Sequence, residues 1–114
     1  MILKELAENL GVGEEIFIKL VGTWLEVFDE DVKKLEDIKT SGNYPEIRII
    51  AHRIKGSSVQ MGFSRIAEVA LAAERKAAAS SVDGIDESIE ELKNLRREIA
   101  ELGLSLKRQP DRKS

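Results

Sequence analysis

The sequence of 114 residues contains no cysteine, so disulfides, thiolate metal ligands and cysteine nucleophiles are all excluded. It also contains only two prolines and few aromatic residues (4%), whereas 42% of the residues are hydrophobic and 34% are charged. This balance is typical of a folded, soluble and mostly helical domain, and not of a disordered chain. The length suits one domain with a modest core, and we expect few strands.

No excess of basic charge is present, since the formal net charge is −3 at pH 7. The chain therefore lacks the positive charge with which nucleic-acid-binding proteins displace phosphate counterions. The basic residues near its end are local, and we interpret residues 107–114 as a polar, disordered tail. The first residues lack the basic region of a signal peptide, and no apolar run approaches the ~18 residues of a membrane span. We expect a cytoplasmic protein without nucleic-acid or membrane partners.

Apolar residues recur at helical spacing along most of the chain. We expect a short first helix to act as a lid, followed by four longer helices with short connections. The predicted helices cover residues 2–10, 14–40, 45–61, 65–79 and 85–106. The apolar stripe of the longest helix contains Phe17, Leu20, Trp24, Phe28, Leu35 and Ile38. The pattern predicts an all-α fold, an antiparallel up-down four-helix bundle with a short extra N-terminal helix, in a domain spanning residues 1–106.

Glycine, proline and serine mark two of the connections between these helices. Gly42 followed by Pro45 predicts a left-handed helix end and then the start of a new helix. Gly62 predicts the end of that helix, and we expect the Ser64 hydroxyl group to cap the following one.

The only histidine of the chain, His52, lies in the predicted third helix. With a rotation of ~100° per residue, the apolar stripe of this helix is centred roughly 160–220° away from His52. That stripe consists of Ile47, Ile50, Ile54 and Met61. The residues within about 60° of His52 on the same wheel include Arg48, Ile49, Lys55, Gly56 and Val59. A histidine of the core would face the isoleucines, so we predict that His52 points outward.

Lys55 and Gly56 follow His52 at three and four positions, so all three share one helix face. A glycine inside a helix costs ~1 kcal/mol relative to alanine, so either a neighbouring helix or a partner must need the room. Because Gly56 lies on the histidine face, we favour a partner or a bulky group on His52. A lysine on an exposed face is usually only solvated, but beside a phosphorylated imidazole it would supply a compact positive charge. Arg48 could assist, although an ordinary salt bridge is its stronger interpretation.

Glu74 is the predicted partner of His52 on the next helix. If the turn has its midpoint at Phe63, residues eleven positions on either side of it face each other in an antiparallel hairpin. A carboxylate that accepts a hydrogen bond from Nδ1 would fix the tautomer and leave Nε2 as the exposed nucleophile. The alternative is an ordinary surface glutamate that pairs with Arg75 or Lys76.

One segment of the chain carries a specific pattern. It reads His52-Arg53-Ile54-Lys55-Gly56-Ser57-Ser58, then Met61-Gly62-Phe63, Ile66 and Glu74. This pattern resembles the signature of histidine-containing phosphotransfer (HPt) domains, including the related phosphotransfer domain at the start of chemotaxis kinases. One departure is Ala73, where that family usually has a larger apolar residue.

The resemblance implies a phosphoryl carrier of a two-component phosphorelay. His52 would accept a phosphoryl group on Nε2 from a receiver's phospho-aspartate or from a kinase, and would pass it to another receiver. By the same resemblance, Lys55 would stabilise the phosphoryl charge, Gly56 would clear the approach and Glu74 would orient His52. The implied partners are response-regulator receiver domains and a sensor or hybrid histidine kinase, and the receiver would supply Mg²⁺. The domain would need no cofactor of its own and would have no kinase or ATPase activity.

Two aliphatic residues, Ile49 and Val59, interrupt the polar character of the face around His52. Together with Arg48 they form a predicted docking surface for the receiver. Scattered exposed aliphatic residues are common, however, and they often have no binding role. We expect the protein to be a monomer.

Three alternative functions remain open. A helical adaptor or dimerisation bundle explains the apolar stripes but not the histidine face. In the dimerisation and phosphoacceptor domain of a sensor kinase, an acid and then a proline usually follow the histidine, whereas here Arg53 follows His52 and the next proline is Pro110. A metal enzyme would rely on one histidine and carboxylates, and no HExxH pattern is present. No phosphate-binding glycine loop is present either, so we expect no autokinase activity.

Overall fold

The computed structural model describes the backbone of residues 3–107 and the side chains of residues 5–101. Over this range the chain forms five helices and no strand. The helices are α1 (Leu3–Leu10), α2 (Glu14–Ile38), α3 (Tyr44–Met61), α4 (Ser64–Ala78) and α5 (Ile85–Lys107). The predicted all-α fold is therefore confirmed.

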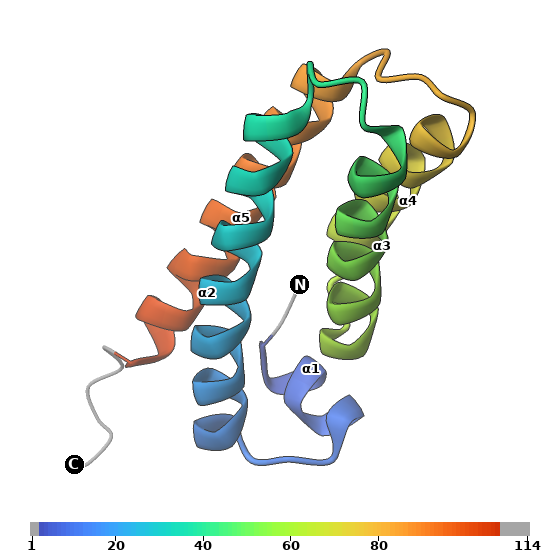
Figure 1. The fold of residues 1–114 in the computed structure, drawn as a ribbon. Helices are drawn as coiled ribbons and strands as arrows, with labels where there is room; N and C mark the ends of the chain where they lie inside the picture. The colour runs from blue at the N-terminus through green and yellow to red at the C-terminus, as the bar shows by residue number, and fades with distance from the viewer. Residues whose placement is uncertain (1–2, 108–114) are drawn as a thin grey trace, which may run out of the picture.

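The four long helices form an antiparallel bundle (Figure 1). Each of them packs against two others, because α2 and α4 both contact α3 and α5. In Figure 1, α2 and α3 lie toward the viewer, α5 lies behind α2, and α4 lies behind α3. The short α1 lies at the lower end of the bundle. This arrangement confirms the predicted four-helix bundle with an extra N-terminal helix.

The core is formed by one apolar stripe from each long helix. Burial of a large apolar side chain contributes ~1.5–3 kcal/mol, so these stripes supply much of the stability. The indole ring of Trp24 stacks on Phe28 with ring centroids 4.7 Å apart, and it meets Phe63 edge-on at 4.8 Å. On α4 the buried residues are mainly alanines, which let this helix approach its neighbours closely. The large buried apolar residues include Phe17, Val21, Val32, Leu35, Ile47, Ile50, Ile54, Met61, Ile66, Ile89, Leu92, Leu95 and Ile99.

The prediction that Leu20 belongs to the buried stripe of α2 is wrong, since this side chain is 41% exposed. The buried stripe is centred between Phe17 and Val21. Leu20 is rotated by about 100° from Val21 and therefore lies at the edge of the stripe. It reaches solvent instead of the core.

The first helix covers one end of the bundle. Ala7 of α1 is buried, and Leu6 packs against the turn between α3 and α4. The contact is close, because a Cβ atom placed on Gly62 would lie 2.8 Å from Cδ2 of Leu6. Glycine at this turn therefore satisfies both the backbone conformation and the packing of α1.

The predicted glycine helix end is present at Gly62, which is the C-cap of α3 with a left-handed φ of 82°. The prediction that Gly42 ends the preceding helix is wrong, because α2 already ends at Ile38 with Lys39 as its C-cap in the right-handed region, so that Gly42 (φ 79°) lies in the connection. The α3 helix is capped by Asn43, whose Oδ1 accepts a hydrogen bond of 3.2 Å from the backbone nitrogen of Glu46. The prediction that Ser64 caps α4 is wrong. Ser64 is the first residue of α4, and the cap position is Phe63, which makes no side-chain capping bond. The chain turns so tightly at Gly62 that α4 begins one residue earlier than expected.

The predicted boundary between domain and tail falls at the end of α5. Lys107 belongs to that helix, whereas residues 108–114 of the predicted tail lie outside the described residues. Within the described part of the chain, no helix has the length and apolar character needed to cross a membrane.

Candidate functional site

His52 projects from α3 with 61% of its side-chain surface exposed. The opposite face of this helix carries Ile47, Ile50 and Ile54, which are 1–2% exposed. The same periodicity that buries the isoleucines therefore turns the imidazole outward, as the helical wheel predicts. No part of the core covers the ring.

Glu74 of α4 holds the imidazole from the side. Its Oε2 lies 3.0 Å from Nδ1 of His52, and the Glu74 side chain is mostly buried, with 16% of its surface exposed. The hairpin around Gly62 and Phe63 thus brings these two residues together, as the sequence spacing predicts. Because a carboxylate only accepts hydrogen bonds, Nδ1 carries the proton in this contact. In the neutral ring, Nε2 then keeps its lone pair.

Lys55 is the third charged or titratable side chain at this site. His52, Glu74 and Lys55 together form the His52 row. The Nζ atom of Lys55 lies 3.9 Å from Oε1 of Glu74, and 28% of the Lys55 side-chain surface is exposed. That Oε1 is buried and accepts no hydrogen bond from the described residues. Glu74 therefore faces His52 with one oxygen and Lys55 with the other, and the ammonium group lies on the same side of α3 as the imidazole.

Gly56 lies in the middle of α3, one turn beyond His52. Apart from its two chain neighbours and the backbone of its own helix, a Cβ atom placed on Gly56 would have no atom within 4 Å. The alternative that a neighbouring helix needs the room is therefore wrong. The open space next to His52 is available to a partner or to a group carried by the imidazole.

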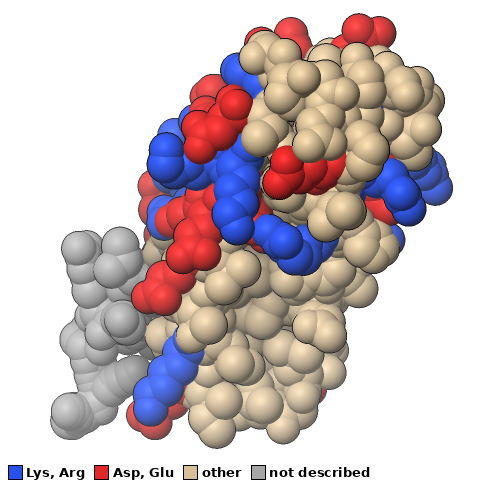
Figure 2. Space-filling view, viewed as in Figure 1, with Lys and Arg blue, Asp and Glu red and all other residues tan. Residues whose placement is uncertain are grey.

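Large apolar side chains of the described residues reach solvent on the side of the bundle formed by α1, α2 and α3. They include the predicted Ile49 (56% exposed) and Val59 (61% exposed). Arg48 is exposed as well. Figure 2 shows this side, and its lower part, over α1 and the lower ends of α2 and α3, carries few charged residues. Ile16 and Val27 of α2 are also exposed, and they were not among the predicted surface residues.

A signal for those two residues was present in the sequence. Ile16, Leu20 and Val27 are spaced by four and seven positions, which places them in one line along α2. All three are 41–55% exposed. They extend the apolar surface from α3 to the neighbouring helix.

A sequence model of the Hpt domain matches residues 19–103, which is most of the chain. This chain belongs to the Hpt domain family. The matched range includes all of α3 and α4. Hpt domains transfer phosphoryl groups through a histidine in phosphorelays, and His52 is the only histidine of this Hpt domain. No curated protein and no solved structure matches the chain.

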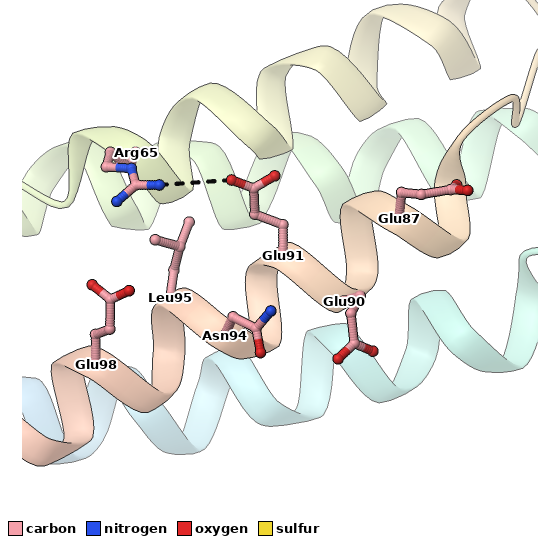
Figure 3. A pocket seen from close by; sticks show the side chains of 7 residues that line it. All are labelled: Arg65, Glu87, Glu90, Glu91, Asn94, Leu95 and Glu98. Carbon is pink, nitrogen blue, oxygen red and sulfur yellow. Dashed lines mark ion pairs between the residues drawn. The ribbon is translucent and has the colours of Figure 1, made fainter.

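The remaining surface of the Hpt domain contains a shallow depression of about 420 Å³ between α4 and α5 (Figure 3). It is lined by Arg65, Glu87, Glu90, Glu91, Asn94, Leu95 and Glu98, and Arg65 forms an ion pair with Glu91. None of the three side chains of the His52 row lines it. The four glutamates of this depression would repel a phosphoryl group.

Proposed function

We propose that this Hpt domain accepts a phosphoryl group on Nε2 of His52 and exchanges it with the aspartate of response-regulator receiver domains. The observation that carries the proposal is the 3.0 Å contact between Nδ1 and Glu74 on a ring that remains 61% exposed. This contact orients the ring and keeps a proton on Nδ1, while a partner can reach Nε2 from solvent.

The transfer to His52 is a substitution at phosphorus. The Nε2 lone pair attacks the phosphorus atom of an aspartyl phosphate, and the bond between phosphorus and the aspartate oxygen breaks as the N–P bond forms. The aspartate leaves as a carboxylate. The ring then holds a proton on Nδ1 and a phosphoryl group on Nε2, and the Glu74 carboxylate neutralises its positive charge. In the reverse step a receiver aspartate attacks and Nε2 leaves with its lone pair.

Lys55 supplies positive charge for the phosphoryl oxygens in this proposal. Its distance of 3.9 Å from Glu74 is longer than a direct hydrogen bond, so the ammonium group is near the site but is not held by a short contact. We infer that Lys55 moves toward the phosphoryl oxygens once His52 carries them. Phosphoryl transfer depends mainly on positioning and on charge stabilisation, and one lysine on the His52 face contributes to both.

The receiver docks on the face around His52. Gly56 leaves room for the approaching loop, Ile49 and Val59 offer apolar contacts, and Arg48 offers a cation at the edge. In this account the receiver brings Mg²⁺ and its acidic pocket, and the domain needs no cofactor. A sensor or hybrid histidine kinase starts the relay, and the domain acts as a monomer without kinase or ATPase activity. The cytoplasmic location stays a prediction.

The experiment is incubation of the domain with receiver domains phosphorylated on aspartate, followed by detection of transferred label. The wild-type domain should acquire a label that acid removes and base does not, as expected for phosphohistidine. The His52→Gln variant should fold but acquire none. Label that persists in this variant, or a wild-type domain that none of a broad panel of receivers labels, would rule the proposal out.

A further inference from the structure

Asp31 is a charged residue buried between α2 and α3. It is far in sequence from the residues of the proposed phosphoryl chemistry. Asp31 of α2 is 3% exposed, and Ser58 is the other buried polar residue in the described part of the chain. A buried carboxylate is costly unless it is paired and hydrogen-bonded. Asp31 therefore needs a partner that donates hydrogen bonds to its carboxylate.

Asp31 is paired with Arg53, the residue that directly follows His52. The guanidinium Nη2 donates to Oδ1 at 2.5 Å, and Nε donates to Oδ2 at 3.4 Å. The hydrogen bonds to Asp31 raise the pKa of Arg53 above its usual value, although partial burial opposes the shift. The two planar groups thus meet as a fork, which restricts the orientation of the arginine.

The pair is asymmetric in exposure. The Asp31 side chain is 5% exposed, whereas half of the Arg53 side-chain surface (50%) reaches solvent. An arginine side chain has five N–H donors, and Asp31 occupies two of them. Three donors of Arg53 remain available to another molecule at the surface.

The position of Arg53 places these donors at the edge of the His52 face. Arg53 is rotated by about 100° from His52 around α3, toward α2, whereas Glu74 and Lys55 lie on the side toward α4. Around α3, Gly56 lies between His52 and Arg53, at about 40° from His52. A protein that covers His52 and Gly56 from above therefore meets Arg53 along its border toward α2.

We propose that Arg53 is a docking residue for the receiver domain and that Asp31 is its positioning residue. Asp31 holds the guanidinium group in place, and the free N–H donors of Arg53 meet acceptor oxygens on the surface of the receiver. This inference rests on the proposed function of His52. Ordering a long side chain at an interface reduces affinity by roughly two- to tenfold, and a side chain that is already ordered avoids this loss.

The test measures the rate of transfer to the domain over a range of concentrations of a receiver that labels the wild-type protein. Each variant then has a maximal rate and a half-saturating receiver concentration. Arg53→Gln should raise the half-saturating concentration by about tenfold, since its contacts are lost. Asp31→Asn should raise it by roughly two- to tenfold, because Arg53 remains but is no longer held. In both variants the maximal rate should stay within about twofold of wild type, because the His52 row is intact.

The chain offers a matched control on the same helix. Asp29 of α2 forms a similar fork with Arg96 of α5, at 3.0 and 2.8 Å, on the side of α2 away from α3. Asp29→Asn and Arg96→Gln should therefore leave both kinetic parameters unchanged. All variants are compared at a temperature at which circular dichroism shows the wild-type helical content.

A second measurement does not depend on any variant. In the wild-type domain, the NMR signal of the Arg53 Nε–H group should be visible because Asp31 holds it, and it should shift when the receiver is added. An unmoved signal would overturn the inference, as would an unchanged half-saturating concentration in Arg53→Gln. A fall of the maximal rate alone would also overturn it, since the pair would then act on His52 and not on docking. If no receiver labels the wild-type domain, the proposed function itself fails; if the wild type is labelled and Arg53→Gln behaves like it, only this inference fails.

Discussion

Replacement of Gly56 by leucine separates the folding of α3 from access to His52. Gly56 lies within the α-helix α3, and a Cβ atom at this position would meet no atom within 4 Å outside its chain neighbours and the backbone of its own helix. Leucine is nearly as good a helix former as alanine, and glycine in a helix costs ~0.8–1 kcal/mol relative to alanine. The Gly56→Leu variant should therefore be more stable than wild type by about 0.5–1 kcal/mol, which raises Tm by roughly 2–6 °C.

The same substitution should impair function. The new side chain lies one turn from His52, on the face that the receiver approaches, and it would keep the two reacting groups apart. A misplacement of ~1 Å in a reacting complex can cost about a hundredfold in rate. We therefore expect transfer from a phosphorylated receiver to slow by about ten- to a hundredfold in Gly56→Leu, measured as the initial rate of labelling at a fixed receiver concentration.

Gly22 provides the control for this experiment. It lies within α2, and a Cβ atom placed on it would also meet nothing within 4 Å. Nine residues separate it from Asp31, which places it on roughly the opposite side of α2 from the helix α3. Gly22→Leu should raise Tm by a similar amount and leave transfer unchanged. A loss of helicity in Gly56→Leu, or equal rates in the Gly56→Leu variant and the wild type, would refute the reasoning.

Three further outcomes follow from the described contacts. Lys55→Met should keep the fold and slow transfer by about tenfold, because one cation near the phosphoryl oxygens is lost; unchanged kinetics would remove Lys55 from the mechanism. Glu74→Gln keeps an acceptor for Nδ1 but loses the negative charge, so labelling of His52 should slow by about tenfold, and a rate equal to wild type would show that only orientation matters. Gly62→Ala should lower the stability by about 1–2 kcal/mol in thermal unfolding, because its φ of 82° is unfavourable for alanine and Leu6 lies against it; an unchanged Tm would contradict this.

The sequence was sufficient to predict the His52 row because that row depends on short-range geometry. The rotation of a regular helix determines that His52 points away from the isoleucines. The tight turn at Gly62 and Phe63 then determines which residue of α4 lies opposite His52. That residue is Glu74, because His52 and Glu74 are each eleven positions from Phe63. Each step depends on helical periodicity or on a turn of a few residues, and both can be recognised in a single sequence.

The pairing of Asp31 with Arg53 could not be predicted in the same way. It depends on how far α3 is shifted along α2 after the connection at residues 39–43, and periodicity contains no information about that shift. The sequence did hold a partial signal, since Asp31 lies next to the apolar stripe of α2 and is rotated by only about 40° from Leu35. The exposure of Leu20 was missed for a related reason, because the width of a buried stripe depends on the neighbouring helices.

The most direct test of the account is the position of the phosphoryl group on the ring of His52. The domain is labelled with ¹⁵N in its histidine, phosphorylated by a receiver, and examined for coupling between phosphorus and each ring nitrogen. We expect coupling to Nε2, with the proton retained on Nδ1 and hydrogen-bonded to Glu74. Coupling to Nδ1, or a phosphoryl group on any residue other than His52, would contradict it.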